Sequence, residues 1–148
     1  MVLARMHSGY AVLGDTQHLP GYCVLLSDTD DADHLTDLHR TARAEFLVDM
    51  ALLGEAVFNV CNGVDPAFRR INYEVLGNTL HQLHAHVHPR YAWEPPEYRG
   101  GPVWRYPDEV REAAEHRPDE RHDGLREAIV AELNRVMAEA YASLDHLA

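Results

Sequence analysis

Residues Leu80–Arg90 read LHQLHAHVHPR, with a glutamine or histidine at every second position from Gln82 to His88. Because side chains alternate between the two faces of a β-strand, this pattern predicts a strand over Leu80–His88. One face of the strand is apolar and is the natural core face: Leu83, Ala85 and Val87. The other face carries an amide and a row of imidazoles: Gln82, His84, His86 and His88. Three histidines at strand spacing are hard to explain as packing, so we expect this face to carry chemistry.

Two kinds of chemistry suit aligned histidines. Neutral imidazoles two residues apart can bind zinc, iron or copper. An imidazole can also attack phosphorus while neighbouring groups hold the phosphate oxygens. The His-x-His of cupin metal sites is usually followed by a glutamate, whereas Arg90 and Tyr91 stand in that window here. Pro89-Arg90 suits an anion site better, and a metal site built on the three histidines stays the alternative.

The composition indicates an acidic globular protein. The chain has 148 residues, 46% of them hydrophobic, and we expect a single domain over residues 1–148. Its formal net charge of −11 argues against a sequence-independent nucleic-acid binder, because such proteins need a basic surface. A small anionic substrate is compatible with that charge, since a local cluster of histidine, arginine and backbone N–H groups can hold a phosphate.

Cysteine usage and the N-terminal residues predict a cytoplasmic protein. Cys23 and Cys61 are far apart and form no C-x-x-C pair, so we expect buried, reduced thiols. The segment Met1–Arg5 begins no apolar run of signal-peptide length, and no stretch is apolar enough for a membrane span. We therefore expect no membrane partner.

Ahead of the histidine row, the sequence predicts two strands and a long helix. Strands are expected at Tyr10–Gly14 and Tyr22–Ser27, because Pro20-Gly21 between them signals a turn. The acidic stretch Asp28–Asp33 predicts a helix start. Apolar residues then recur in steps of three or four, which predicts one amphipathic helix, or a short helix followed by a long one, ending at Asn62-Gly63.

The segments around the histidine row complete an α+β fold. Phe68–Leu76 alternates like a strand, and Gly77-Asn78 signals a sharp turn before the next one. Residues 94–118 are rich in proline, glycine and aromatics, a composition typical of a loop that covers a site. Residues 119–148 predict a C-terminal amphipathic helix. We expect an antiparallel sheet of about five strands with the long helix packed on one face.

At these residues the sequence resembles the histidine triad (HIT) family of nucleotide hydrolases and transferases. The hallmark of that family is His-x-His-x-His-x-x on one strand, often followed by Pro-Arg. Aligning Pro89-Arg90 with that ending puts three residues at the triad positions, in the order Gln82, His84 and His86. Upstream, Asn72 and the run Gly77, Asn78 and Thr79 match the Asn/Gln and Gly-Gln-Ser/Thr that precede the triad.

The resemblance covers about residues 10–93, which would form the core of a HIT-like domain. Within it, Asp15–Leu26 also looks like the family's pattern. The stretch Ile71-Asn72-Tyr73, followed by Leu76-Gly77-Asn78, looks closest to bacterial members described as diadenosine tetraphosphate hydrolases.

The resemblance implies a two-step reaction on a nucleotide substrate. His84 would attack the α-phosphate and form a covalent nucleotidyl-imidazole, which water or another acceptor then releases. His86 would donate to a phosphate oxygen, and Thr79 with nearby backbone N–H groups of Gly77 and Asn78 would complete the phosphate cradle. Asn72 would hold phosphate or ribose, and Asp15 the ribose hydroxyls.

The resemblance also implies a homodimer with a continuous sheet and no required cofactor. Magnesium would enter only on the phosphates of the substrate.

Two positions depart from the family pattern. Gln82 replaces the first histidine of the triad, whose backbone carbonyl fixes the tautomer of the nucleophile. That carbonyl survives the change, while a group that can carry a proton is lost. His88 stands where the family usually has an apolar residue. It could bind phosphate or lie solvated at the strand end, and we favour the solvated position.

Four functions remain open from the sequence. The leading one is hydrolysis of a phosphoanhydride or phosphoramidate at a nucleoside α-phosphate, of a dinucleoside polyphosphate or a nucleoside phosphoramidate. The second is nucleotidyl transfer to phosphate or another acceptor, as in a phosphorylase. The third, suggested by Gln82, is a non-catalytic nucleotide-binding protein, and the fourth is a metal-binding protein built on the histidine cluster.

Overall fold

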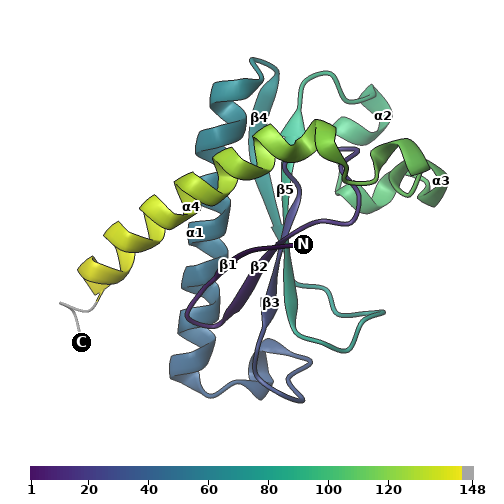
Figure 1. The fold of residues 1–148 in the computed structure, drawn as a ribbon. Coiled ribbons are helices and arrows are strands. Elements are labelled where there is room, and N and C mark those ends of the chain that lie inside the picture. The colour runs from purple at the N-terminus through teal and green to yellow at the C-terminus, as the bar shows by residue number, and fades with distance from the viewer. Residues whose placement is uncertain (145–148) are drawn as a thin grey trace.

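The computed structural model describes residues 1–144, which form one twisted sheet with helices on both sides (Figure 1). The five strands are ordered β1-β2-β3-β5-β4, and every neighbouring pair is antiparallel. Their bounds are Val2–Arg5 for β1, Gly9–Leu13 for β2, Cys23–Ser27 for β3, Phe68–Glu74 for β4 and His84–Tyr91 for β5. The predicted α+β class and the five-stranded antiparallel sheet are confirmed.

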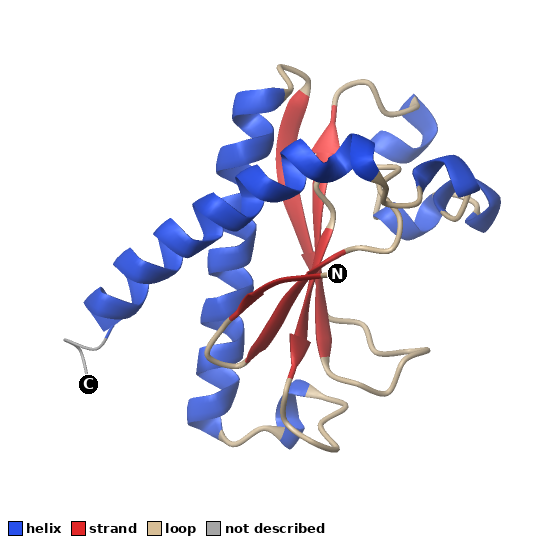
Figure 2. Ribbon diagram, in the orientation of Figure 1, coloured by secondary structure: helices blue, strands red, loops and turns tan. Residues whose placement is uncertain are grey.

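The long helices and the short helices lie on opposite sides of the sheet (Figure 2). Helices α1 (Arg40–Val64) and α4 (Asp123–Leu144) pack against each other on one side. The segment after β5, with helices α2 (Pro96–Arg99) and α3 (Asp108–Arg111), lies on the other. Short 3₁₀ turns span Leu35–Asp37, Val103–Arg105, Ala114–His116 and Glu120–His122.

The main core fills the space between the sheet and the two long helices. Its fully buried side chains come from both layers and include Ala11, Cys23, Leu25, Ala85 and Val87 of the sheet, Phe46, Leu53 and Val57 of α1, and Ile129 and Leu133 of α4. The apolar face of β5 therefore packs on the helices, as predicted. By the strand alternation, the histidines of β5 face the opposite side.

The strand with the histidines begins later than predicted. It starts at His84 instead of Leu80 and runs on to Tyr91. Pairing with β4 stops at Glu74, which lies opposite His86, and Gly77 then takes a left-handed conformation with φ 71°. Residues 80–83 consequently have no partner strand in β4 and belong to the connecting loop.

The first long helix also begins later than the acidic stretch predicted. The structure has the short-then-long alternative: a 3₁₀ turn at Leu35–Asp37, then α1 from Arg40. Asp37 accepts hydrogen bonds from the backbone N–H groups of Asp33 and His34, at 3.0 and 2.8 Å, so the acidic residues stabilise the turn rather than α1. The helix ends at Val64, close to the predicted Asn62-Gly63.

Strand β1 was not predicted, because four residues at the edge of a sheet give too short a pattern. Helix α4 begins at Asp123, after the predicted start at residue 119, and residues 145–148 of that prediction lie outside the described residues.

Cys23 and Cys61 are buried free thiols, as predicted. No helix within residues 1–144 combines the length and apolar character needed to cross a bilayer.

Candidate active site

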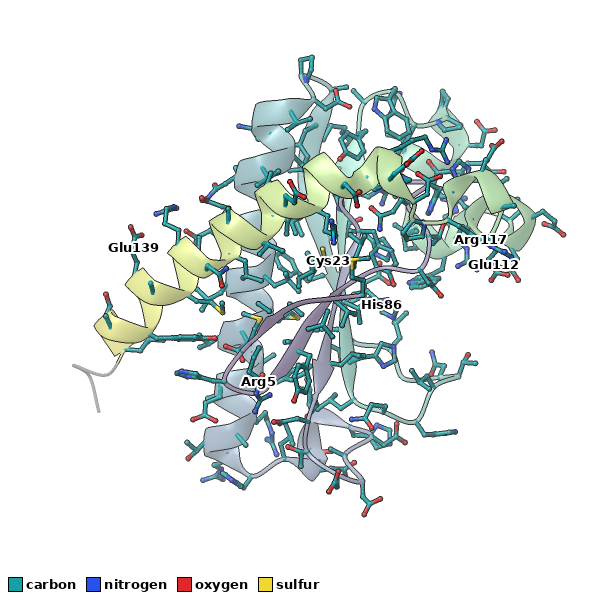
Figure 3. All side chains as sticks on the ribbon, in the orientation of Figure 1. Arg5, Cys23, His86, Glu112, Arg117 and Glu139 are labelled. Carbon is teal, nitrogen blue, oxygen red and sulfur yellow. The ribbon has the colours of Figure 1, made fainter. Side chains whose placement is uncertain are left out.

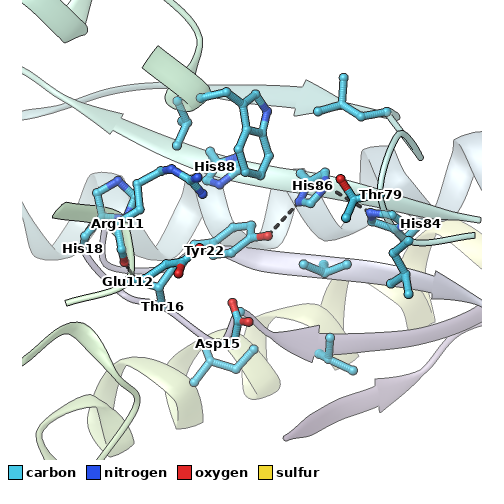
Figure 4. A pocket seen from close by; sticks show the side chains of 18 of the residues that line it. Asp15, Thr16, His18, Tyr22, Thr79, His84, His86, His88, Arg111 and Glu112 are labelled. Atoms are coloured by element: carbon cyan, nitrogen blue, oxygen red, sulfur yellow. Dashed lines mark hydrogen bonds between the residues drawn. The ribbon is translucent and has the colours of Figure 1, made fainter. Parts of the chain in front are cut away.

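The register of β3 against β5 builds one wall of a cavity. Val24 lies opposite His86 and Leu26 opposite His84, so these side chains share the face away from the long helices. The imidazoles of His84, His86 and His88 all line one cavity of about 1100 Å³ (Figure 4). The segment after β5 supplies the facing wall, which agrees with the expectation that residues 94–118 cover a site.

A chain of hydrogen bonds joins four residues along this wall. The Tyr22 hydroxyl lies 2.7 Å from Nδ1 of His86, and Nε2 of His86 lies 3.1 Å from Nε2 of His84. Nδ1 of His84 then lies 2.6 Å from the backbone carbonyl oxygen of Gln82. Figure 4 shows Tyr22, His86 and His84 in this order across the cavity.

The backbone carbonyl of Gln82 sets the tautomers of both histidines in this series of hydrogen bonds. A carbonyl oxygen can only accept, so Nδ1 of His84 carries the proton and Nε2 is the free base in the neutral ring. His86 must then donate from Nε2, which leaves its Nδ1 to accept from the Tyr22 hydroxyl. Every donor therefore meets an acceptor, and the unprotonated nitrogen of His84 faces the cavity wall beside His86.

Burial keeps the donors of this chain neutral. Burial, with a smaller contribution from His84, lowers the pKa of His86 to about 4. Burial also raises the pKa of Tyr22, so its hydroxyl keeps the proton that it donates. Near neutral pH, Tyr22 and His86 both stay uncharged and the hydrogen-bond directions above hold.

Gln82 acts through its backbone, and its side chain lies elsewhere. The side-chain amide donates to the carbonyl oxygen of Ser27 at 2.8 Å and does not line the cavity. The amide anchors the loop that precedes β5, while the carbonyl orients His84.

The expectation that His88 lies solvated at the strand end is wrong. Its side chain is 1% exposed and stacks on Tyr22, with ring centroids 4.0 Å apart and planes 5° apart. The indole of Trp104 packs edge-on against the same imidazole at 5.7 Å. The strand continues past His88 and the 94–118 segment covers it, which the strand pattern could not reveal.

The remaining predicted residues divide into two groups. Asp15, Gly77, Asn78 and Thr79 line the cavity with the histidines. Asn72 does not line it: its side-chain oxygen accepts from the Arg90 guanidinium at 2.7 Å.

Arg90 ties the covering segment to the sheet. Its guanidinium forms a buried ion pair with Glu94 at 2.9 Å and donates to the carbonyl oxygens of Tyr98 and Gly101 at 3.0 and 2.6 Å. Tyr106 donates to the same Glu94 carboxylate at 2.9 Å. The Pro-Arg pair, which suggested an anion site, thus serves to fix the loop.

Sequence reasoning did not single out several cavity residues: Tyr22, His18, Trp104 and Arg111. The signal for Tyr22 was available, because it precedes Val24 by two residues and so shares the face of the histidines once β3 pairs with β5. Trp104 packs edge-on against His86 at 4.9 Å, and Arg111 lies over the Trp104 ring at 4.9 Å. Nothing in a loop-rich segment indicates which of its residues turn inward.

Within residues 1–144, no three histidine, cysteine, aspartate or glutamate side chains are arranged to hold a metal ion.

Comparison with known proteins identifies the fold. No model of a protein family and no curated protein matches the chain. Solved structures do match: a histidine triad protein from Sinorhizobium meliloti has 22% identity and a TM-score of 0.73, over 89% of this chain and 88% of that one. A histidine triad protein from Marinobacter aquaeolei has 19% identity and a TM-score of 0.67, over 94% and 89%.

A third match, a zinc-bound histidine triad family protein from Mycobacterium smegmatis, has 15% identity and a TM-score of 0.59, over 93% of this chain and 86% of that one. At these identities the likeness concerns the fold. The sheet, the two long helices and the histidine row on β5 agree with it, and the chain has the histidine triad fold.

Proposed function

We propose that this protein is a nucleotide hydrolase that acts at a nucleoside α-phosphate through a covalent nucleotidyl intermediate on His84. The observation that carries the proposal is the hydrogen bond between Nδ1 of His84 and the Gln82 carbonyl oxygen. It leaves Nε2 of a neutral imidazole as a free base in a cavity large enough for a nucleotide.

The residues have distinct parts in the proposed reaction. Nε2 of His84 forms a bond to the α-phosphorus as the bond from phosphorus to the leaving group breaks, and the electron pair goes to the leaving group. The Nε2–H of His86 turns from His84 to an oxygen of the phosphate and stabilises the charge that develops there. The Gln82 carbonyl accepts from Nδ1–H of His84 and stabilises the positive charge of the substituted ring.

Water completes the cycle. It attacks the same phosphorus and releases a proton to solvent, the bond to Nε2 breaks, and the lone pair returns to His84. The apolar side chains beside His84 suit the base and sugar of a nucleoside: Val12, Val24, Leu26, Leu76 and Leu80. Asp15 and Thr79 line the same cavity, and in the proposed reaction they bind ribose and phosphate.

Intact-protein mass spectrometry after a brief incubation tests the proposal. The substrates are a panel of dinucleoside polyphosphates and nucleoside phosphoramidates, and the His84→Ala variant is the control. We expect an adduct of one nucleotidyl group in the native protein and none in the variant. Turnover without an adduct, or an equal adduct in both proteins, would contradict the proposal.

Two alternative functions would use the same cavity. Transfer of the nucleotidyl group to phosphate or another acceptor needs the same adduct and differs only in what releases it. A binder without turnover was suggested by the amide at position 82, and that argument is weaker because the Gln82 side chain points to Ser27. The diadenosine tetraphosphate subtype, the homodimer, the cytoplasmic location and the independence from metals stay predictions.

A further inference from the structure

The cavity has two chemically different ends, separated by His86 and Tyr22 (Figure 4). The end beside His84 is lined by aliphatic side chains. The opposite end is lined by His18, His88 and Arg111, with Glu112 beside them. Glu112 and Arg117 both come from the segment after β5, to the right of the sheet in Figure 3.

His18 has no partner in the protein for either ring nitrogen. Its side chain lines the cavity at 8% exposure, and neither Nδ1 nor Nε2 has a hydrogen-bond partner within residues 1–144. Nδ1 of His88, at the same end, is also buried without a partner in that range. Buried polar atoms are nearly always hydrogen-bonded in folded proteins, so two such rings in one cavity indicate a ligand that satisfies them.

The backbone next to His18 is attached to the covering segment. The Thr16 hydroxyl donates to the Arg111 carbonyl, and the Gln17 N–H donates to the His116 carbonyl at 2.6 Å. The imidazole of His18 packs edge-on against Tyr106, with ring centroids 5.1 Å apart. These contacts place the His18 ring at this end of the cavity.

Arg111 supplies positive charge beside the two unpartnered rings. It lies over Trp104, and its charge disfavours the protonated forms of His18 and His88. Burial is the larger cause and brings the pKa of His18 to about 4, so each ring is neutral near pH 7 and offers one N–H. Arg111 also pairs with the exposed carboxylate of Asp108, and the carboxylates of the cavity lining are Asp15 and Glu112.

We propose that His18, His88 and Arg111 form an anion subsite that binds the phosphates on the leaving side of the α-phosphorus. This inference rests on the proposed function and narrows its substrate to nucleotides with a phosphate or polyphosphate leaving group. A nucleoside phosphoramidate, whose leaving group is an amine, would leave these donors unused. Neutral imidazole N–H groups and a guanidinium are donors that phosphate oxygens accept.

Equilibrium binding tests the subsite without requiring turnover. The probes are AMP, which lacks leaving-side phosphates, and α,β-methylene-ATP, which carries them and cannot be cleaved at that position. We expect the native protein to bind α,β-methylene-ATP about 10-fold or more tightly than AMP, the value of a charge-assisted hydrogen bond. Arg111→Gln should remove most of this preference and change the AMP affinity by about twofold or less.

Arg105→Gln is the matched control. Arg105 is an exposed arginine of the same segment that does not line the cavity, so its replacement changes the net charge equally. The native preference should survive it. Equal binding of the two probes by the native protein, or an equal loss of preference in both variants, would overturn the inference.

A second measurement addresses His18 directly and uses the native protein. Inorganic triphosphate is titrated while the ring ¹⁵N resonances of the histidines are followed, with His18→Leu for assignment. We expect the His18 resonance to shift until the protein is saturated with triphosphate. A His18 resonance that triphosphate does not shift would overturn the subsite.

The two proposals fail in different ways. Protein that prefers α,β-methylene-ATP but forms no adduct on His84 keeps the subsite and loses the proposed reaction. Protein that forms the adduct without that preference keeps the reaction and loses the subsite.

Discussion

Both faces of β5 carry buried side chains, but these are held by different means. Ala85 and Val87 are fully buried against the long helices, where apolar contact is sufficient. On the other face His84 and His88 are 8% and 1% exposed, and they are held by a hydrogen bond to a carbonyl and by stacking on an aromatic ring.

This difference separates the residues that stabilise the fold from the residues that carry the proposed function. Burying an imidazole costs free energy unless its nitrogens are partnered, whereas burying a valine stabilises the fold directly. Histidines whose ring nitrogens need partners therefore stabilise the fold less than apolar side chains of similar size. The core face should therefore respond to substitution in stability, and the cavity face in activity.

The largest effect on the cavity face is expected at His84. Replacing it with alanine removes the proposed nucleophile and should lower turnover by about 10⁴-fold or more, the scale of other lost nucleophiles. Single-turnover kinetics on a competent substrate measure the loss, and circular dichroism checks that the fold is unchanged. A loss below about 100-fold would mean that another group attacks phosphorus.

Val87→Ala tests the core face, where we expect a change in stability and little change in activity. Removing two buried methyl groups should lower the free energy of unfolding by about 2–3 kcal/mol, through lost apolar burial and the cavity left behind. Urea titration gives this value. Activity measured well below the unfolding transition should change by less than about twofold, and a large loss there would show that the two faces are not separable.

Acid should destabilise the protein through the cavity face. Burial holds the pKa of His18 near 4 and that of His88 well below 6.5, whereas both return to about 6.5 when the chain unfolds. As the pH falls below 6.5, these two histidines are protonated in the unfolded chain but stay neutral in the native protein. The free energy of unfolding therefore falls. For these two groups the loss is about 3 kcal/mol between pH 7.5 and 5.5.

Urea midpoints at these two pH values measure the effect, and His18→Leu should make the pH dependence shallower. Stability that rises on acidification would contradict the neutral, buried state of these rings.

Tyr22→Phe should have a smaller, purely catalytic effect. It keeps the ring stacked on His88 and removes the hydroxyl that donates to Nδ1 of His86. We expect kcat to fall by about 10-fold, the value of one hydrogen bond, with little change in KM. A KM effect with unchanged kcat would place Tyr22 in substrate binding instead.

The smallest effect is expected at Gln82. Gln82→Ala keeps the backbone carbonyl and loses only the bond to Ser27, so turnover should fall by less than about 10-fold. Because the side chain points away from the cavity, Gln82→His should have the same pH–rate profile as the native protein. A new titration near the imidazole range in that variant would show that position 82 does exchange protons with the site.

The sheet and the long helices followed from the sequence because their patterns are local. Alternation along 83–88 and helical periodicity along α1 are visible in a single chain, and each indicates which face is buried. The start of β5 and of α1 did not follow, since they depend on where the partner strand ends and on a 3₁₀ turn that uses Asp37 as its cap.

The candidate site followed where it lies on a strand or in the segments that resemble the family pattern, as Asp15 and Thr79 do. The positions of His84 and His86 came from strand spacing, and the burial of His88 did not, because Trp104 covers it from a segment without periodicity. Asn72, which was matched by the family pattern, contacts Arg90 and does not line the cavity, so its role toward a substrate stays a prediction.

Identifying the ring nitrogen that carries phosphorus tests the proposed reaction most directly. The native protein is quenched in alkaline denaturant during turnover, and the adduct is located by peptide mapping and by the ³¹P chemical shift of the phosphoramidate. The hydrogen bond from Nδ1 of His84 to the Gln82 carbonyl requires a single adduct, on His84, through Nε2. An adduct through Nδ1, or on His86, would contradict it.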